Sequence, residues 1–374
     1  MSLDSISLTE EVFYGLALGL IPGIGHIHAK TLLSYSGSFS GIFKAKPSTL
    51  VRIPGMGPEL VRRITGFTDW DLIDKEIRYM EGQGIRPLFY NESDFPQRLL
   101  HFNDSPFLLF CKGNAGLNTA KTIGMVGTRA PSQAGIKWTN QLIGALKDSH
   151  ITVVSGFAYG IDITAHKACI REGIPTIGVL AGGFRNIYPS LHLRYVDQMC
   201  ENGGLITEAY SDILPEKQRF PMRNRIIAAL SDGLIVVESA EKGGSIITAE
   251  YGFNYNKTVM AVPGKPADLL SRGCNALIKA QKAAMIEDYT DMLKEMNWDD
   301  DGRPRKKALQ IELFRSLSDK EQALINFLIR NGETHIDTLI HQLNMRNSEL
   351  ASMILALTLE GMITQLPGSR ITLS

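Results

Sequence analysis

The sequence predicts an α/β protein: a doubly wound, mainly parallel sheet with a helical region on either side of it along the chain. Two observations predict this. Between residues 121 and 290, short β-rich apolar runs alternate with stretches of helical periodicity, which is typical of a parallel sheet covered by helices on both faces. Before and after this region the apolar periodicity is mostly helical.

Residues 1–85 are expected to form a helical domain of the helix-hairpin-helix or SAM-like kind. Two similar segments, Ile-Pro-Gly-Ile-Gly at 21–25 and Ile-Pro-Gly-Met-Gly at 53–57, each precede an apolar-periodic stretch. In a helix-hairpin-helix such a turn offers backbone N–H groups to a DNA phosphate. Only Lys30 in one copy, and Arg62 with Arg63 in the other, add positive charge. We therefore interpret the pair as a fold signature more than as a binding site.

Residues 86–290 are expected to form an extended Rossmann-like domain. Its first part, to about residue 120, is predicted to be a proline-containing connector that ends in an apolar stretch at 107–110 and packs on the sheet. Six runs then predict strands, at 122–126, 151–154, 176–180, 204–206, 234–237 and 258–262. In this architecture ligands bind at the carboxyl ends of the strands.

A polar linker is predicted at 291–307, and a winged-helix domain at 308–374. Helices are expected at 318–330, with Ser318 as N-cap, at 336–342 and at 348–360, followed by a hairpin through 362–364 and 370–372. The third helix carries Glu349 and Glu360 but no lysine or arginine, whereas base reading in the major groove relies on Arg, Lys, Asn or Gln. Protein contact or dimer support is therefore a better interpretation of this domain than sequence-specific regulation.

Composition limits the possible functions. The 39 basic and 39 acidic residues give a formal net charge of zero, so any nucleic-acid site must be a local cluster. Four scattered cysteines fit neither a metal site nor a disulfide framework, and the histidines form no metal set, so no metal is expected. With no signal-peptide order and no run of 18 apolar residues, we expect a cytoplasmic protein without a membrane span.

The turn after the first strand suits a phosphate. Residues 124–129 read Gly-Met-Val-Gly-Thr-Arg, without the third glycine of a dinucleotide fingerprint, and no acidic residue ends the second strand to hold a ribose. A Walker loop is also absent, so neither a nicotinamide nor an ATP cofactor is expected. What remains is a small-residue turn with Arg129, whose guanidinium can grip a phosphate through two hydrogen bonds.

Residues 217–225 hold the strongest cluster of positive charge. Lys217, Arg219, Arg223 and Arg225 lie within nine residues without an acid, and Phe220 lies among them. Single-strand binders combine cations that follow the phosphates with a ring that stacks on an unpaired base. Cations at a helix N-terminus are moreover opposed by the helix dipole unless an anion is present. We therefore predict an anion site here.

A second anion site is predicted after the fifth strand. Gly243, Gly244 and Ser245 place N–H groups and a hydroxyl at the start of a helix, next to Lys242. Together with the sites at Arg129 and at 217–225, they describe a track along one edge of the sheet.

Taken together, these residues resemble the DNA-processing protein A (DprA/Smf) family over nearly the whole chain. The matching pieces are GTRAPS at 127–132, SGFAYGID at 155–162, AGGFRNIYPSLH at 181–192, FPMRNRIIAALS at 220–231, KGGSIITA at 242–249 and AVPG at 261–264. Departures are Phe184-Arg185-Asn186 in the third-strand loop and KGG in place of KSG. The resemblance implies a homodimer that binds single-stranded DNA and helps to load the RecA recombinase during natural transformation.

The resemblance also assigns roles to residues. Arg129 and Lys217 match basic positions, Phe220 the base-stacking aromatic, and Arg223, Arg225 and Lys257 further basic positions near the DNA path. The complete DNA-binding set predicted for this chain is Arg129, Gly156, Lys217, Phe220, Arg223, Arg225, Lys242, Gly243, Ser245 and Lys257.

The main alternative is an enzyme. The nucleotide phosphoribohydrolases, also known as lysine-decarboxylase-like proteins, share a similar core and carry a PGGxGTxxE loop. Here Gly243, Gly244 and Glu250 fall at matching spacing, but Ile246 and Ile247 replace the Gly-Thr pair that holds a nucleotide phosphate. We therefore expect no catalytic activity; release of free base from a nucleoside monophosphate would favour the alternative.

Overall fold

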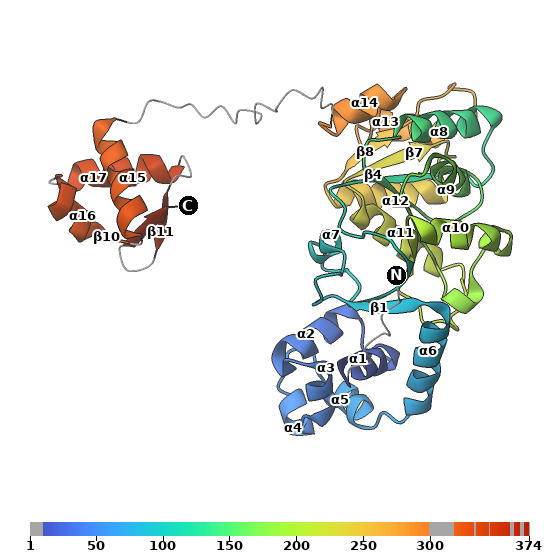
Figure 1. The fold of residues 1–374 in the computed structure, drawn as a ribbon, viewed down its shortest axis with the longest axis horizontal. Helices are drawn as coiled ribbons and strands as arrows, with labels where there is room; N and C mark the ends of the chain where they lie inside the picture. The colour runs from blue at the N-terminus through green and yellow to red at the C-terminus, as the bar shows by residue number, and fades with distance from the viewer. Residues whose placement is uncertain are drawn as a thin grey trace. The chain divides into compact units, whose positions relative to one another are not determined.

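The computed structural model describes residues 10–298, 318–332, 334–343, 345–359, 363–366 and 370–373. The chain divides into two compact units, Met1–Asp299 and Asp300–Ser374. Each unit is described by itself below (Figure 1).

A nine-stranded sheet is the framework of the first unit. The strand order is β1-β2-β6-β5-β4-β3-β7-β8-β9. All neighbours from β6 to β9 pair in parallel, whereas β2 pairs antiparallel with both β1 and β6. The strands are β1 (Ile85–Phe89), β2 (Leu108–Gly113), β3 (Lys121–Gly127), β4 (Ile151–Ser155), β5 (Thr176–Val179), β6 (Gly204–Thr207), β7 (Gly233–Val237), β8 (Thr258–Ala261) and β9 (Ala284–Met285).

The mainly parallel Rossmann-like sheet is thus confirmed, with β3 to β8 as the six predicted strands. The predicted connector before them is wrong in part, because it holds β2 and most of β1. Pro87 lies in β1, where the sequence suggested an irregular segment. Proline is tolerated there because β1 is an edge strand with only one neighbour.

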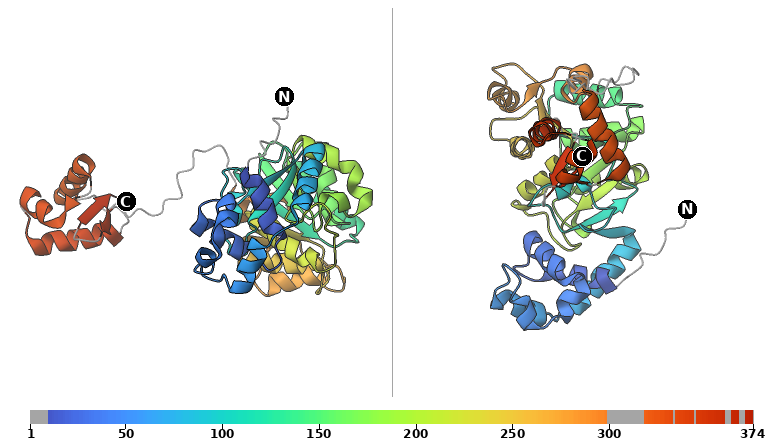
Figure 2. Two further views of the ribbon diagram at one scale, coloured as in Figure 1. Left: turned by 90° about the horizontal axis from the view of Figure 1, so that it is seen from below. Right: turned by 90° about the vertical axis from the view of Figure 1, so that its left-hand side faces the viewer.

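Helices cover both faces of the sheet (Figure 2). One face packs against α8 (Gln133–Ala145), α9 (Ile161–Glu172) and α14 (Tyr289–Glu295), the other against α11 (Arg219–Leu230), α12 (Gly244–Asn254) and α13 (Arg272–Lys279). Successive strand residues alternate between the two cores: Met125 and Ile235 face the first group, and Val126 and Val236 the second. Both faces are buried, which explains why the strands read as continuous apolar runs.

The N-terminal helices lie beside β1 at one end of the sheet (Figure 1). They are α1 (Glu10–Leu20), α2 (His26–Ser36), α3 (Phe39–Lys44), α4 (Pro47–Leu50), α5 (Pro58–Thr65) and α6 (Trp70–Gln83). The turns before α2 and α5 contain Gly23 and Gly55 with φ of +88° and +81°, a conformation that side chains disfavour. The two sequence repeats therefore have matching turn geometry.

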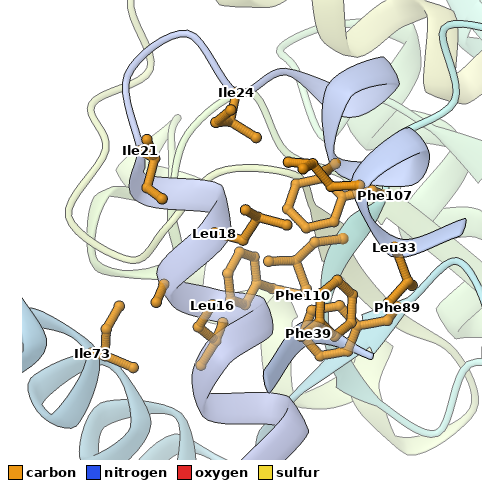
Figure 3. Packing of buried hydrophobic residues seen from close by; sticks show 14 of the residues in the cluster. Leu16, Leu18, Ile21, Ile24, Leu33, Phe39, Ile73, Phe89, Phe107 and Phe110 are labelled. Carbon is orange, nitrogen blue, oxygen red and sulfur yellow. The ribbon is translucent and has the colours of Figure 1, made fainter. Parts of the chain in front are cut away.

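The N-terminal helices share one apolar core with the edge of the sheet. Leu16 and Leu18 of α1 and Phe39 of α3 converge with Phe89 of β1 and Phe110 of β2 (Figure 3). The rings of Phe39 and Phe89 lie 4.8 Å apart between centroids. This continuous core explains why these helices and the sheet form a single compact unit.

The second unit is a winged helix, as predicted. Its helices are α15 (Asp319–Asn331), α16 (Ile336–Leu343) and α17 (Asn347–Leu359), and its sheet has the order β10 (Thr334–His335), β12 (Arg370–Leu373), β11 (Ile363–Leu366). Ser318 caps α15 through a reciprocal capping box with Glu321. Glu360 and Met362, which were assigned to the third helix and the hairpin, lie outside the described residues.

The predicted linker begins too early. Tyr289–Glu295 is helical as α14, and Trp298 packs against the core under this helix, with Lys121 Nζ 5.5 Å from its ring centroid. The rest of the predicted linker, residues 299–307, lies outside the described residues.

Three further findings concern the described part of the chain. None of its helices has the length and apolarity needed to cross a bilayer. It contains no group of three or more His, Cys, Asp or Glu side chains placed to hold a metal ion. All four cysteines are free thiols.

Candidate nucleic-acid interface

A pocket of about 650 Å³ lies at the carboxyl edge of the sheet. From β3 the chain steps outward through β4 and β5 to β6, and then returns to the other side of β3 to form β7 and β8. Such a reversal opens a crevice between the loops that follow the central strands. The pocket lies there, lined by the loops after β3, β4, β5, β6 and β7 and by the first turns of α11 and α12.

The turn after β3 directs Arg129 toward solvent. A Cβ on Gly127 would stand 2.0 Å from the carbonyl oxygen of Val237, so only glycine allows β3 to approach β7 this closely. The N–H of Thr128 donates to the carbonyl of Glu238 over 2.7 Å, which ties the two loops together. Arg129 is exposed at the pocket, and its guanidinium lies 5.1 Å from the ring centroid of Phe220.

The start of α11 brings Lys217 and Phe220 to the same pocket, as the sequence predicted. Lys217 is exposed, whereas Phe220 is half-buried in the first turn of the helix. Within the described residues, no carboxylate pairs with Lys217 or Arg129. Both positive charges are therefore available to an incoming anion.

Arg223 borders the pocket but serves the fold. The side chain is only 5% exposed, and its Nη1 donates to the carbonyl oxygens of Gly156 and Val179, which follow β4 and end β5. Burial lowers the pKa of Arg223 to about 10, and the neighbouring Asp162 opposes this shift. The arginine keeps its charge at neutral pH, but its Nη1 and Nε donate hydrogen bonds to groups of the protein. The prediction that it neutralises a phosphate is corrected accordingly.

Gly156 is likewise a structural residue. A Cβ at this position would lie 2.5 Å from Oδ2 of Asp162 and 2.8 Å from Nη2 of Arg223. Its missing side chain therefore makes room for this buried pair of charges. Burial raises the pKa of Asp162, and the charge of Arg223 opposes that effect.

Arg225 does not line the pocket. Its side chain donates from Nη1 to the carbonyl of Asp104 over 2.7 Å and from Nη2 to Glu208. His26 of α2 completes the cluster, with its Nε2 3.2 Å from Glu208. Burial raises the pKa of Glu208, but the hydrogen bond from His26 and the charge of Arg225 outweigh it and hold this pKa below its usual value. Arg225 thus joins α11 to the N-terminal helices, and its assignment to the DNA path is corrected.

Lys257 lies at the wrong edge of the sheet for the predicted track. It precedes β8, and a residue ahead of a parallel strand lies at the amino edge, opposite the pocket. Its half-buried ammonium lies 5.5 Å from the ring centroid of Phe102. We therefore remove Lys257 from the candidate interface.

The start of α12 forms the far wall of the pocket. Gly243 is the N-cap, Gly244 is exposed, and Lys242 lies just before them on the surface. Ser245 is buried, and its hydroxyl donates to Oγ of Ser239 over 2.8 Å. What α12 offers an anion is therefore its first N–H groups, which have no acceptor within the helix.

Tyr188 is a pocket residue that sequence reasoning missed as a site. It follows β5, is 47% exposed, and its ring centroid lies 6.1 Å from that of Phe220. Its place in the loop after a predicted strand was the signal available in the sequence.

The first unit is therefore a Rossmann-like α/β module with a cationic and aromatic pocket at its strand ends, and the second is a winged helix. The family described as DNA recombination-mediator protein A matches residues 86–297, and the DprA winged helix domain matches residues 314–369. The chain belongs to the DprA/Smf family of DNA-processing proteins.

Individual relatives agree with this assignment. The chain is 32% identical to Protein Smf of Synechocystis over 72% of its own length and 69% of the relative's. It is 39% identical to the DNA processing protein DprA of Bacillus subtilis, over 58% of this chain and 73% of the relative. The X-ray structure of DprA from Streptococcus pneumoniae superposes with a TM-score of 0.67 at 30% identity, over 76% of this chain and 97% of that one.

A DprA structure from Helicobacter pylori, described for its single-stranded DNA binding mode, superposes with a TM-score of 0.52 at 27% identity. The match covers 57% of this chain and 96% of that one.

Proposed function

We propose that this protein binds single-stranded DNA, without strong sequence preference, in the pocket at the carboxyl edge of its sheet. The observation that carries the proposal is the meeting of two unpaired cations, Arg129 and Lys217, with the ring of Phe220 and the open N-terminus of α12. Cations attract any phosphate backbone, whereas stacking on a ring requires an unpaired base. The single-strand binding described for the H. pylori relative supports this proposal.

Fluorescence anisotropy with a labelled oligo-dT and a duplex of equal length tests it. Phe220→Ala is expected to weaken single-strand binding by about 1–3 kcal/mol, because the base loses its stacking partner. The matched control is Phe253→Ala, an exposed phenylalanine at the far end of α12. An equal loss on duplex DNA would mean that Phe220 only supports the fold. Chelator and the omission of nucleotide are expected to leave affinity unchanged.

We further propose that the bound strand is passed to RecA in the cytoplasm, and that the protein acts as a homodimer without a catalytic step. The description of the family as a recombination mediator supports the first point. Sedimentation would measure the dimer, and the rate at which RecA forms filaments on strands coated with single-strand binding protein would measure the transfer. A rate of RecA filament formation that stays unchanged when this protein is added would contradict the proposed transfer.

The phosphoribohydrolase alternative requires release of free base from a nucleoside monophosphate.

A further inference from the structure

Three aromatic rings form a row that leads out of the pocket. Phe220 of α11 is followed by Tyr188, in the loop after β5, and then by Tyr159, in the loop after β4. Successive ring centroids are 6.1 Å apart in both steps, and successive planes are almost perpendicular, at 82° and 90°. The row therefore crosses from α11 to the loops of two neighbouring strands.

The two tyrosines are more accessible than the phenylalanine. Tyr188 is 47% exposed and Tyr159 is 37% exposed, although large aromatic side chains are usually well covered in a folded domain. Phe220 is half-buried and already contacts the guanidinium of Arg129. A base that stacks on Phe220 must share the ring with this cation, whereas the tyrosines offer uncovered surface.

Positive charge lies at the outer end of the row. The ring of Tyr159 lies 5.1 Å from that of His192, in the 3-10 helix Ser190–Tyr195. Near the end of the same helix, the guanidinium of Arg194 lies 4.8 Å from the ring centroid of Tyr195, and the ammonium of Lys167 lies 5.8 Å from it. Both cations are exposed, and within the described residues neither pairs with a carboxylate.

We propose that Tyr159, next to Tyr188 at the edge of the pocket, begins a second stretch of the single-strand path, which carries the DNA from the pocket toward Lys167 and Arg194. The combination of exposed rings and unpaired cations is what sequence-tolerant single-strand binding uses. The 6.1 Å spacing exceeds the roughly 3.4 Å between stacked bases of a duplex, so the row suits bases that are already apart. This inference rests on the proposed function and gives the direction in which the strand leaves the pocket.

Oligo-dT of two lengths separates the two stretches. A strand of about 4 nucleotides fills the pocket, which includes Tyr188, whereas one of about 12 nucleotides also reaches Tyr159. Anisotropy measures the affinity for each strand, and the quantity compared is the affinity for the long strand divided by that for the short one. Tyr159→Ala is expected to lower this ratio about fivefold or more, since one stacked base is lost from the long strand alone. Tyr159→Phe keeps the ring and is expected to keep the ratio.

Tyr35→Ala is the matched control, because Tyr35 is an exposed tyrosine on α2, outside the row. A ratio in Tyr159→Ala equal to that of the wild type and of Tyr35→Ala would overturn the second stretch while leaving the pocket intact. The same ratio in Arg194→Ala is expected to fall as well, and to fall less at high salt. Failure of the wild type to bind either length would instead contradict the proposed function itself.

Discussion

Arg129 and Arg223 border the same pocket, and their surroundings decide what each can do. Arg129 is exposed and has no carboxylate partner in the described part of the chain, while Arg223 is buried and donates to two backbone carbonyls. A cation that is exposed and unpaired can exchange its counterions for a phosphate. If the buried Arg223 turned toward a phosphate, the two backbone carbonyls that accept its hydrogen bonds would be left without a donor, which costs free energy.

Replacing Arg129 by alanine is expected to change the salt dependence of binding. Arg129, Lys217 and Lys242 together predict a slope of about −2 for log affinity against log salt, at about −0.7 for each phosphate neutralised on a single strand. Arg129→Ala should make the slope shallower by about 0.7 and leave the melting temperature unchanged. Lys147→Ala, at an exposed lysine just after α8, is the control. An unchanged slope with a lowered melting temperature would show that Arg129 holds the fold.

Arg223→Ala is expected to lower the stability of the fold, whereas Arg129→Ala is expected to leave it unchanged. The change removes the counter-charge of the buried Asp162 and leaves the carbonyls of Gly156 and Val179 without a donor. The free energy of unfolding, measured in urea, should fall by about 3 kcal/mol. Normal stability combined with weakened binding would restore Arg223 as a direct phosphate contact.

For single residues, the sequence predicts which residue types lie near the edge of the sheet, but not the direction in which each side chain points. Lys217 and Phe220 were correctly expected to meet Arg129, because strand-end loops and helix starts share one edge of the sheet. Arg223 and Arg225 appeared as one cluster with them. On a helix of 3.6 residues per turn, however, side chains two positions apart point about 200° apart. One arginine therefore anchors the strand ends while the other reaches the N-terminal helices.

Among the elements, the start of α12 is the clearest candidate for phosphate contact through the backbone. A Cβ on Gly244 would meet no protein atom within 4 Å, so an added methyl group would stand in the open pocket. Gly244→Ala is expected to keep or raise stability by about 0.5 kcal/mol, because alanine restricts the unfolded chain. Single-strand affinity should fall by about 1 kcal/mol or more as the anion is held away from the N–H groups.

Gly144→Ala is a chemically identical control at the end of α8, where a Cβ also meets nothing within 4 Å. Both variants are compared by anisotropy and thermal unfolding. Equal affinities for the two would exclude α12 from the interface.

The strands show why some elements escaped prediction. β3 to β8 are apolar runs buried on both faces, and their pattern is visible in the sequence. β1 contains Pro87, which argues against a central strand but is compatible with an edge. Whether such a run joins a sheet depends on a distant partner, here β2, and the local sequence does not supply that information.

For the first unit as a whole, the cluster of His26, Glu208 and Arg225 joins the N-terminal helices to the helix that carries Phe220. Glu208→Gln leaves Arg225 without its counter-charge and is expected to lower the free energy of unfolding by about 3 kcal/mol near neutral pH. The folded-state pKa of Glu208 lies below its ordinary 4.5, so its stabilising effect is present above that value.

The stability difference between wild type and Glu208→Gln should therefore persist above pH 4.5 and decrease as the pH falls through the lowered pKa. Urea unfolding at a series of pH values measures it. A difference that grows on acidification would contradict the assigned pairing.

The overall architecture was largely predictable because alternating strands and helices, and the order of helices before a hairpin, are local patterns. The continuous core that joins the N-terminal helices to β1 and β2 was not, since it brings together residues as distant in the sequence as Leu16 and Phe110. The predicted boundary at residue 85 therefore divides a compact unit.

Photo-crosslinking tests the central claim, that single-stranded DNA lies in the pocket at the carboxyl edge of the sheet. Oligo-dT carrying a photoreactive bromodeoxyuridine is irradiated with the full chain, and the modified peptides are identified by mass spectrometry. The account predicts crosslinks at Phe220 and in the turn that holds Arg129, because both border the pocket. Crosslinks confined to α2 and α5, or to the winged helix, would contradict it.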